Sequence, residues 1–479
     1  MTMRVWLCQC AAFAAALLCV PVSAPAAGQA TFARAGAQAA STLLRAFYTG
    51  GRWRLCNGRR CGEASSDWGA DSLTYALWMA WKGSRAHADA TALAAIGVAM
   101  PRYSGACGNA CPTWSDAPAW DAVALARIYE ATGENAFRTR AIAALRDAGD
   151  VRFVGGACAA IAYQRARPSP SDLKTLETGA NATKAALLLY RATNDRRFLD
   201  EAIATYAAER ALFLDPSVPL YTVHAIDDGA RCTQVAHRFF ASVNGDMIWN
   251  GIALWQATGR RAFYDEAVET GEAVDTYLSD DDGVFSDVQG ENDVEEPLVE
   301  AMAALAAQTN ERFAREWILR NAAAALSSRA SDGVFSRFFD GPPQAVASAW
   351  ETNGGIALEI AAAAIDGAAA ARSQPWDGDV VERVTSLPAR ITFTGMGVAL
   401  VGTIGERCVE RHIRVEVDGV ATFDRTGLWQ NPHMPGGAHV LFAWRWQTPG
   451  THTIELEPAA PGESGTGALK VAGVVSSRS

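Results

Sequence analysis

Apolar helices recur along the first three quarters of the chain, and each is followed by a residue that tolerates a left-handed backbone. A polar cluster begins each helix, and a run of Ala, Leu, Ile or Val follows it. Glycine and asparagine end helices because they adopt positive φ at little cost. We therefore expect six helix ends, at Gly83, Gly133, Asn194, Gly259, Asn310 and Gly367.

The spacing of these helix ends predicts a repeat, with one helix before each end and one after it. The period ranges from 50 residues (Gly83 to Gly133) to 65 residues (Asn194 to Gly259), and such a period is typical of stacked helical hairpins. The helix before each end is apolar around its circumference and should be buried, whereas the helix after it carries charges and should face solvent. The predicted fold is mainly α, an (α/α)6 toroid of six helical hairpins over residues 29–372.

The long loops of this toroid should lie at one end. All six inner helices are expected to run in the same direction, so the segments before them converge, and the turns at the opposite end are short. Functional residues concentrate on loops held by a rigid scaffold, so this end is the predicted working face. The long loops are residues 51–66, 101–115, 150–176, 212–243, 278–292 and 332–349.

The composition changes after the helical repeats. Residues 376–479 contain short β-rich runs, such as Ile413-Arg-Val-Glu-Val-Asp-Gly419, separated by turn residues. This pattern predicts a small all-β, jelly-roll-like sandwich that serves as an accessory domain. Three tryptophans in it, Trp429, Trp444 and Trp446, fit either a sugar-binding platform or the core of the sandwich, and the sequence favours neither.

The start of the chain and its cysteines indicate export. Residues 1–28 contain one charge, Arg4, then an apolar run and small residues, as in a secretory signal peptide. The apolar run is too short to span a bilayer, so we expect a secreted or periplasmic protein without membrane insertion. Disulfides are then the default for cysteines, and the predicted pairs are Cys56–Cys61, Cys107–Cys111 and Cys158–Cys232, with Cys408 left over.

Charge and ligand spacing narrow the possible partners. The formal net charge of −10 argues against nucleic acid, which requires a basic surface. Zinc is the rival interpretation of Cys107 and Cys111, but no histidine or further cysteine lies at suitable spacing. We expect no metal, no cofactor and a monomeric protein.

Carboxylates and tryptophans gather at the predicted starts of the inner helices. Some of these polar residues cap helices, but capping requires neither tryptophan nor several carboxylates per helix. Indole faces stack on pyranose rings, and paired carboxyl groups carry out glycoside hydrolysis, so we expect a polysaccharide or oligosaccharide substrate. The catalytic candidates are Asp116, Asp71 and Asp246. The candidates for substrate binding are Asp67, Trp68, Trp114, Ser115, Trp120, Glu177, Asn181, Asn244, Trp249, Trp350 and Glu351.

Two segments resemble glycoside hydrolase family 76. Trp114-Ser-Asp-Ala-Pro-Ala-Trp120, followed by a helix ending in Tyr129-Glu-Ala-Thr-Gly133, is similar to the family's signature, and Phe239-Phe-Ala-Ser-Val-Asn-Gly245 is similar to a second motif. The resemblance covers the helical domain and implies an (α/α)6 barrel and a secreted endo-α-1,6-mannanase. It also implies that Asp116 is the general acid/base, the second of two adjacent aspartates.

One departure from the family motif bears on activity. Ser115 occupies the position of the first aspartate, the nucleophile, and a serine cannot replace that carboxylate. Another acid must then supply the second function, and Asp71, Asp246 and Glu351 are candidates from neighbouring helix starts. A wider separation of the carboxyl groups would indicate inversion.

Three functions remain open. The sequence favours a secreted glycoside hydrolase that cleaves an α-linked, mannan-like polysaccharide. Ser115 supports a catalytically inactive glycan-binding protein instead. A polysaccharide lyase on the same fold would need a tyrosine or histidine base, for which Tyr221, His224 and His237 are the candidates.

Overall fold

A computed structural model describes most of the chain after residue 26. The described residues are 27–54, 56–57, 68–103, 114–152, 156–166, 172–286, 295–344, 347–365, 376, 380–382, 384, 387–403, 411–428, 438–458 and 470–477. The predicted signal segment therefore lies almost entirely outside the described residues. Within the described part, no helix is both long and apolar enough to cross a membrane.

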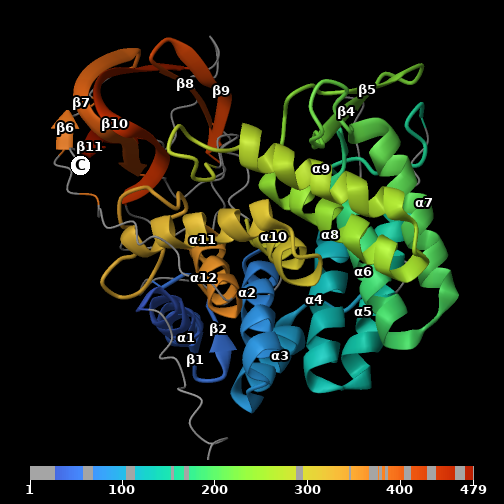
Figure 1. Cartoon of the computed structure of the whole chain (residues 1–479). Coiled ribbons are helices and arrows are strands. Elements are labelled where there is room, and N and C mark those ends of the chain that lie inside the picture. Colours follow the sequence, from blue (N-terminus) through green and yellow to red (C-terminus); the bar gives the residue numbers. More distant parts are fainter. Residues whose placement is uncertain are drawn as a thin grey trace, which may run out of the picture.

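Six inner helices form a closed barrel (Figure 1), in which each contacts the next and the last contacts the first. Their interior faces are largely Ala, Leu, Ile and Val, which belong to one continuous hydrophobic core. The inner helices are α2 (Trp68–Ser84), α4 (Ala117–Thr132), α6 (Glu177–Thr193), α8 (Ala241–Thr258), α10 (Glu296–Gln308) and α12 (Ala349–Ala364).

A second layer of helices surrounds this barrel, so the predicted (α/α)6 architecture is confirmed. Five outer helices each follow an inner one along the chain: α3 (His87–Ala99), α5 (Asn135–Arg152), α7 (Arg196–Phe213), α9 (Arg261–Tyr277) and α11 (Arg312–Ser327). The sixth outer position differs from the predicted repeat, because α1 (Ala27–Phe47), from the start of the chain, packs against α12.

Four of the six predicted helix ends have the expected left-handed backbone. Their φ angles are 73° at Gly133, 55° at Asn194, 70° at Gly259 and 61° at Asn310. The first prediction was wrong by two residues, because α2 continues to Ser84 and the left-handed residue is Arg85, with a φ of 55°. Gly367 lies outside the described residues.

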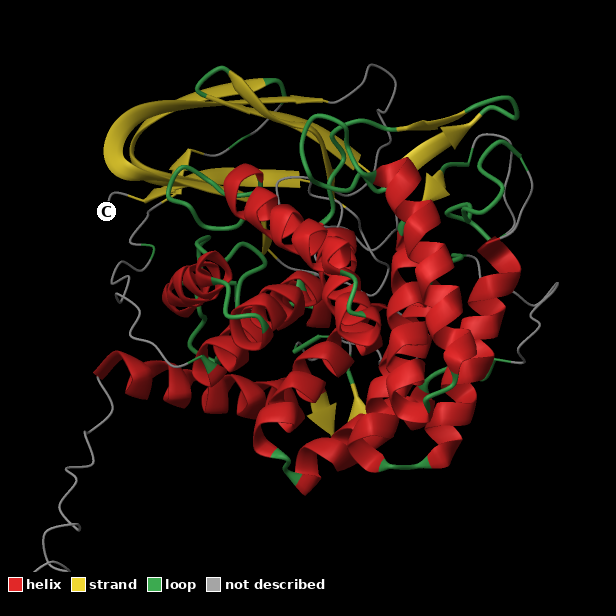
Figure 2. Cartoon of the chain, turned by 45° about the vertical axis from the view of Figure 1, so that its right-hand side comes forward, coloured by secondary structure: helices red, strands yellow, loops and turns green. Residues whose placement is uncertain are grey.

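The inner helices begin at the end of the barrel that carries the long connections, here called the open end. Two β structures lie there, at the top of Figure 2: the C-terminal sheet and a three-stranded sheet of β3 (Lys174–Thr175), β4 (His224–Asp227) and β5 (Cys232–Gln234). A short hairpin of β1 (Tyr48–Thr49) and β2 (Arg52–Trp53) follows α1. The inner helices finish at the opposite end, here called the far end, where short turns lead to the outer helices.

The C-terminal domain is one six-stranded antiparallel sheet folded into two layers. Its strand order is β6-β11-β7-β10-β8-β9. The two longest strands, β7 and β10, pair along most of their length and bend together, with a register shift between Arg445 and Gly450; Figure 2 shows the resulting curl. Apolar side chains from both halves fill the space between the layers, as predicted for a sandwich. The strands are β6 (Val380–Glu382), β7 (Ala389–Thr403), β8 (Arg411–Val417), β9 (Val420–Leu428), β10 (Ala438–Pro458) and β11 (Lys470–Ser477).

The sandwich docks on the barrel through a polar contact at the start of α12. His439 Nδ1 of β10 lies 2.8 Å from Glu351 Oε1, and Gln344 Nε2 lies 2.9 Å from the same oxygen. Burial alone would raise the pKa of Glu351, but His439, Gln344 and the backbone of Ser348 outweigh it and lower that pKa to about 2. Glu351 also completes a capping box with Ser348. The carboxylate predicted as a substrate ligand or second catalytic acid therefore joins the two domains.

Replacing His439 with leucine should destabilise the protein by about 3 kcal/mol or more, since it leaves the Glu351 carboxylate buried without its cationic partner. Urea unfolding measures this free energy. His87→Leu is the matched control, because His87 is exposed at the start of α3 and should change stability little. Equal stability of the two variants would contradict the docking role of His439.

Two tryptophans of the sandwich are also used for packing. Trp446 is nearly buried in the core between the layers and stacks on His452, with ring centroids 3.6 Å apart. Trp444 Nε1 lies 3.4 Å from Asp281 Oδ2, on a barrel loop. These contacts favour the core and interface interpretation over a sugar platform for both; Trp429 lies outside the described residues.

Candidate active site

Polar side chains from all six inner helices or the residues just before them are buried at the open end. Within the described part of the chain, these are Asp71, Ser72, Ser115, Asp116, Glu177, Thr178, Asn244, Asp246, Glu295, Glu296, Glu351 and Asn353. Burial of so many polar groups requires that they pair with one another. The side chains that pair with one another for structural reasons are not available for catalysis. Their contacts therefore show which carboxyl groups remain as catalytic candidates.

Asp116 stands directly before α4, and its side chain does not cap that helix. Pro118 occupies one of the first helical positions, where a missing N–H costs nothing. The segment before Asp116 is anchored by backbone pairing: Ser115 N–H donates to the carbonyl of Gln164 at 3.1 Å, and Trp114 forms a bridge with Arg165. These contacts hold Asp116 at the open end.

Ser115 connects the start of α4 to the start of α6. Its hydroxyl lies 2.7 Å from Thr178 Oγ1 and also donates to the carbonyl of Tyr163. The residue that departs from the family motif is therefore a structural link. It sets α6, and with it Glu177, beside α4.

Glu177, the first residue of α6, is the carboxyl group that interacts with Asp116. Burial raises the pKa of Glu177 to about 8, and the negative charge of Asp116 adds to this effect. Thr175 Oγ1, at 3.3 Å from Glu177 Oε2, and the charge of Arg238 act in the opposite direction. Burial and the neighbouring Asp116 therefore favour a protonated Glu177 at neutral pH, and two carboxyl groups that differ in this way can act as acid and base.

Asp246 belongs to a buried charge layer across the middle of the barrel. Lys184 Nζ lies 2.8 Å from Asp246 Oδ1 and 2.7 Å from Glu300 Oε2, and Arg127 also pairs with Glu300. The Arg127 guanidinium covers the Tyr75 ring at 3.9 Å. These contacts favour a structural role for Asp246 over the predicted catalytic one, because its carboxylate pairs with Lys184 inside the barrel.

The remaining catalytic candidate, Asp71, is buried in the first turn of α2. Its negative charge contributes to raising the pKa values of Tyr75 and Tyr103, although burial is the larger cause for both. Asp71 therefore lies near Tyr75 of α2 and Tyr103, which follows α3.

Three predicted sugar-stacking tryptophans lie in the hydrophobic core instead. Trp120, Trp249 and Trp350 are at most 4% exposed and belong to the core cluster of the barrel, which favours a packing role for them over sugar stacking at the open end. Trp114 is half-buried, with the guanidinium of Arg165 over its ring at 4.9 Å. Asp67 and the side chain of Trp68 lie outside the described residues.

The two asparagines that were predicted to bind substrate form hydrogen bonds with backbone atoms instead. Asn244 accepts from Tyr221 N–H at 2.8 Å and donates to the carbonyls of Tyr221 and Phe240. Asn181 donates to the carbonyl of Glu177 at 3.0 Å. Both side chains are fully buried; Asn244 fixes the segment at Tyr221, whereas Asn181 bonds within the first turn of its own helix.

The histidines and tyrosine of the lyase hypothesis are poorly suited as bases. Tyr221 donates to Glu266 of the outer helix α9 at 2.5 Å, and burial, with Tyr206 and Glu266 adding to it, raises its pKa well above the ordinary value. Burial, helped by Arg238, lowers the pKa of His224 to about 3. His237 is largely exposed, 3.6 Å from Asp215.

One predicted disulfide is described completely. Cys158 and Cys232 are bonded and join the loop after α5 to β5, so two open-end loops are tied together. Cys56 is also disulfide-bonded, while Cys61, Cys107, Cys111 and Cys408 lie outside the described residues. Among the described residues, no group of three or more histidines, cysteines or carboxylates could hold a metal ion.

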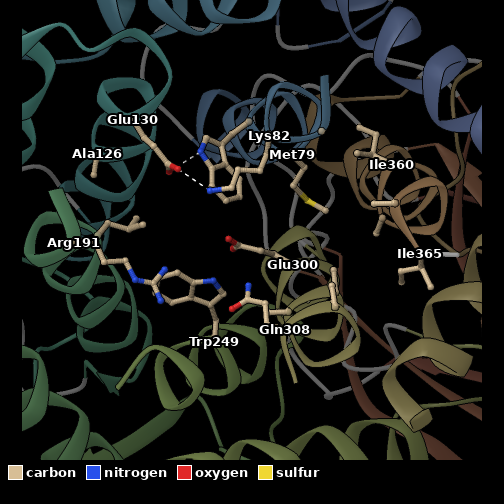
Figure 3. A pocket seen from close by; sticks show the side chains of 18 of the residues that line it. Met79, Lys82, Ala126, Glu130, Arg191, Trp249, Glu300, Gln308, Ile360 and Ile365 are labelled. Carbon is tan, nitrogen blue, oxygen red and sulfur yellow. Dashed lines mark hydrogen bonds and ion pairs between the residues drawn. The ribbon is translucent and has the colours of Figure 1, made fainter. Parts of the chain in front are cut away.

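A cavity lies at the far end of the barrel, away from these side chains (Figure 3). Its volume is about 570 Å³, and the inner helices contribute to its lining. No sequence motif predicted this cavity. Lys184 and Arg127 were a signal for the charges beside it, because a single cation inside an apolar helix requires a buried carboxylate. Glu300 of the charge layer that they form contributes to the lining of this cavity.

Comparison with known proteins assigns the fold of the helical domain. No protein-family profile matches the sequence, and no curated protein matches it. Among solved structures, an inactive variant of the family 76 α-1,6-mannanase of Salegentibacter sp. HEL1_6, with two consecutive aspartates replaced by alanine and α-1,6-mannotetrose bound, matches with a TM-score of 0.60 and 18% identity over 70% of this chain and 99% of that one.

Two further solved structures set the range of this similarity. A family 76 α-mannanase of Bacteroides thetaiotaomicron matches with a TM-score of 0.57 and 16% identity, over 69% of this chain and 95% of that one. A cellobiose 2-epimerase of Bacillus thermoamylovorans matches with a TM-score of 0.54 and 11% identity, over 69% and 99%. At such identities the similarity shows the fold alone.

Proposed function

Because the helical domain has the fold of family 76 glycoside hydrolases, we propose that this chain is a glycoside hydrolase that cleaves an α-linked mannan at the open end of its barrel. The neighbours with this fold include α-1,6-mannanases, one of them bound to an α-1,6-linked mannose oligosaccharide. The proposal for this chain rests on its own carboxyl groups.

The proposal is carried by the position of Asp116 and Glu177 at neighbouring helix starts, where the charge of Asp116 acts on Glu177. Glu177, with its pKa raised to about 8, donates its proton to the glycosidic oxygen as the bond to the anomeric carbon breaks. The Asp116 carboxylate acts on the anomeric carbon, either as nucleophile or through a water molecule that it deprotonates. This assigns the acid to Glu177 and not, as the sequence suggested, to Asp116.

Glu177 also accounts for the serine at position 115. The family motif takes both carboxyl groups from one helix start, whereas here the second group comes from the neighbouring helix. The Ser115–Thr178 contact of 2.7 Å holds the two helix starts together. A serine at this position is then compatible with hydrolysis.

Hydrolysis of α-1,6-mannan by the purified protein tests the proposal. We expect release of reducing ends from α-1,6-mannan but not from β-1,4-mannan. Asp116→Asn should lower this rate by at least about 10²-fold. Glu134→Gln, at an exposed position in the turn after α4, is the control and should retain full activity. An Asp116→Asn protein as active as the control would overturn the proposal.

A glycan-binding protein without hydrolytic activity is the second candidate. Ser115 favours it, since the inactive variant of the Salegentibacter mannanase lacks two consecutive aspartates and this chain has one aspartate at the matching motif. Binding of α-1,6-mannan by the wild-type protein without release of reducing ends would select this candidate.

We also propose that the protein is exported. The residue 1–28 segment has the features of a signal peptide, and the Cys158–Cys232 disulfide fits an oxidising compartment.

A further inference from the structure

The far-end cavity lies where the inner helices finish, on the other side of the charge layer from Asp116 and Glu177. Its volume of about 570 Å³ falls within the range of roughly 300–1,000 Å³ that is usual for small-molecule sites. Exposed residues such as Lys82 and Gln308 contribute to its lining, so a ligand can enter from solvent.

Glu300 forms the floor of this cavity and offers one free acceptor. Figure 3 shows its carboxylate reaching towards the middle of the cavity. Oε2 pairs with Lys184 at 2.7 Å and with Arg127, whereas Oε1 has no hydrogen-bond partner among the described residues. Burial alone would raise the pKa of Glu300, but Arg127 and Lys184 outweigh it and hold that pKa below its ordinary value. A buried, ionised carboxylate oxygen without a donor is costly.

The walls above Glu300 are apolar and aromatic. Trp78 and Trp249 contribute indole rings, and Met79, Leu188 and Ile360 contribute aliphatic surface. Both indoles are held rigidly: Trp78 Nε1 donates to Glu130 Oε2 at 3.1 Å, and the guanidinium of Arg191 covers Trp249 at 4.9 Å. Such walls bind an apolar body the size of a ring.

Most charges around the cavity are paired with one another. Lys82 pairs with Glu130 at 2.7 Å, Arg127 pairs with Glu300, and Lys184 pairs with both Glu300 and Asp246. Arg191 donates to the neutral side chain of Gln256 at 2.8 Å and covers the Trp249 ring, so these contacts do not neutralise its charge. At the floor of the cavity the charges are matched, and the remaining requirement there is one hydrogen-bond donor for Glu300 Oε1.

We propose that this far-end cavity binds a small uncharged ligand with a ring-sized apolar body and a hydroxyl group that donates to Oε1 of Glu300. The charge layer and the depth of the barrel separate this site from the proposed catalytic pair, so it can be tested independently of hydrolysis.

Calorimetric titration of the full mature protein with phenol tests this site, with toluene as the isostere that lacks the donor. Phenol should bind at least about tenfold more tightly than toluene, because toluene leaves Oε1 without a partner. Ala303→Trp, which places an indole in the cavity from its half-buried wall, should lower phenol affinity at least about tenfold. Ala207→Trp, at an exposed position on α7, is the matched control.

A phenol-soaked crystal of the wild-type protein provides a check that does not depend on either variant folding. Its hydroxyl oxygen should lie within hydrogen-bond distance of Glu300 Oε1. The proposal is overturned if phenol does not bind, if toluene binds as tightly, if Ala303→Trp binds phenol like the control, or if the soaked phenol lies elsewhere.

Discussion

Glu177→Gln is expected to slow hydrolysis of α-1,6-mannan by roughly 10⁴-fold, the upper end of the range for loss of a general acid. The leaving group in a mannan is a sugar alkoxide, which departs only when it is protonated, and glutamine cannot supply that proton. The measurement is the initial rate of reducing-end release by the purified variant, with Glu134→Gln as the control.

A substrate with an activated leaving group separates general-acid loss from damage to the site. An aryl α-mannoside that releases a nitrophenolate needs no proton, so any wild-type activity on it should survive Glu177→Gln.

The wild-type rate on mannan should also fall as the pH rises past about 8, because Glu177 loses its proton there. A rate on mannan that is unchanged in the variant, or one that does not fall above this pH, would remove Glu177 from the role of acid.

Lys184→Met is expected to destabilise the protein by about 3–5 kcal/mol, because it removes a cation from a fully buried layer and leaves the two carboxylates with one cation between them. Lys184 contacts Asp246 at 2.8 Å and Glu300 at 2.7 Å; Arg127 remains paired with Glu300, but Asp246 loses its ion-pair partner. Urea unfolding gives the free-energy difference.

Lys82→Met is the matched control for Lys184→Met. Lys82 forms a single ion pair with Glu130 at 2.7 Å, with both side chains partly exposed, and exposed pairs contribute about 0–1 kcal/mol. If the two variants lost the same stability, the charge layer would have no special role in holding the inner helices together.

The helical architecture could be predicted because its signals are local. Four residues that end helices, such as Gly133 and Asn194, have the left-handed backbone that their residue types favour. Apolar inner helices and charged outer helices then determine which layer each helix joins. The place of α1 could not be predicted in this way, since nothing near residue 27 indicates that its partner is α12.

The candidate site was predicted less completely, because its members depend on contacts between distant helices. Asp116 was identified from its motif, but the role of Glu177 follows from burial and from the charge of a residue on another helix. In the sequence, Glu351 resembles the other carboxylates at helix starts. Only the packing of the sandwich on the barrel shows that His439 contacts its carboxylate. Trp249 was expected at the open end and instead contributes to the lining of the far-end cavity.

The packing of α1 against α12 has a consequence for biosynthesis. The helix that leaves the ribosome first finds its permanent neighbour only when the last inner helix has been made, so an incomplete nascent chain exposes an apolar surface at the unfilled seam. Such surfaces promote aggregation during folding. For export as proposed above, a delay before closure would keep the chain unfolded for transport.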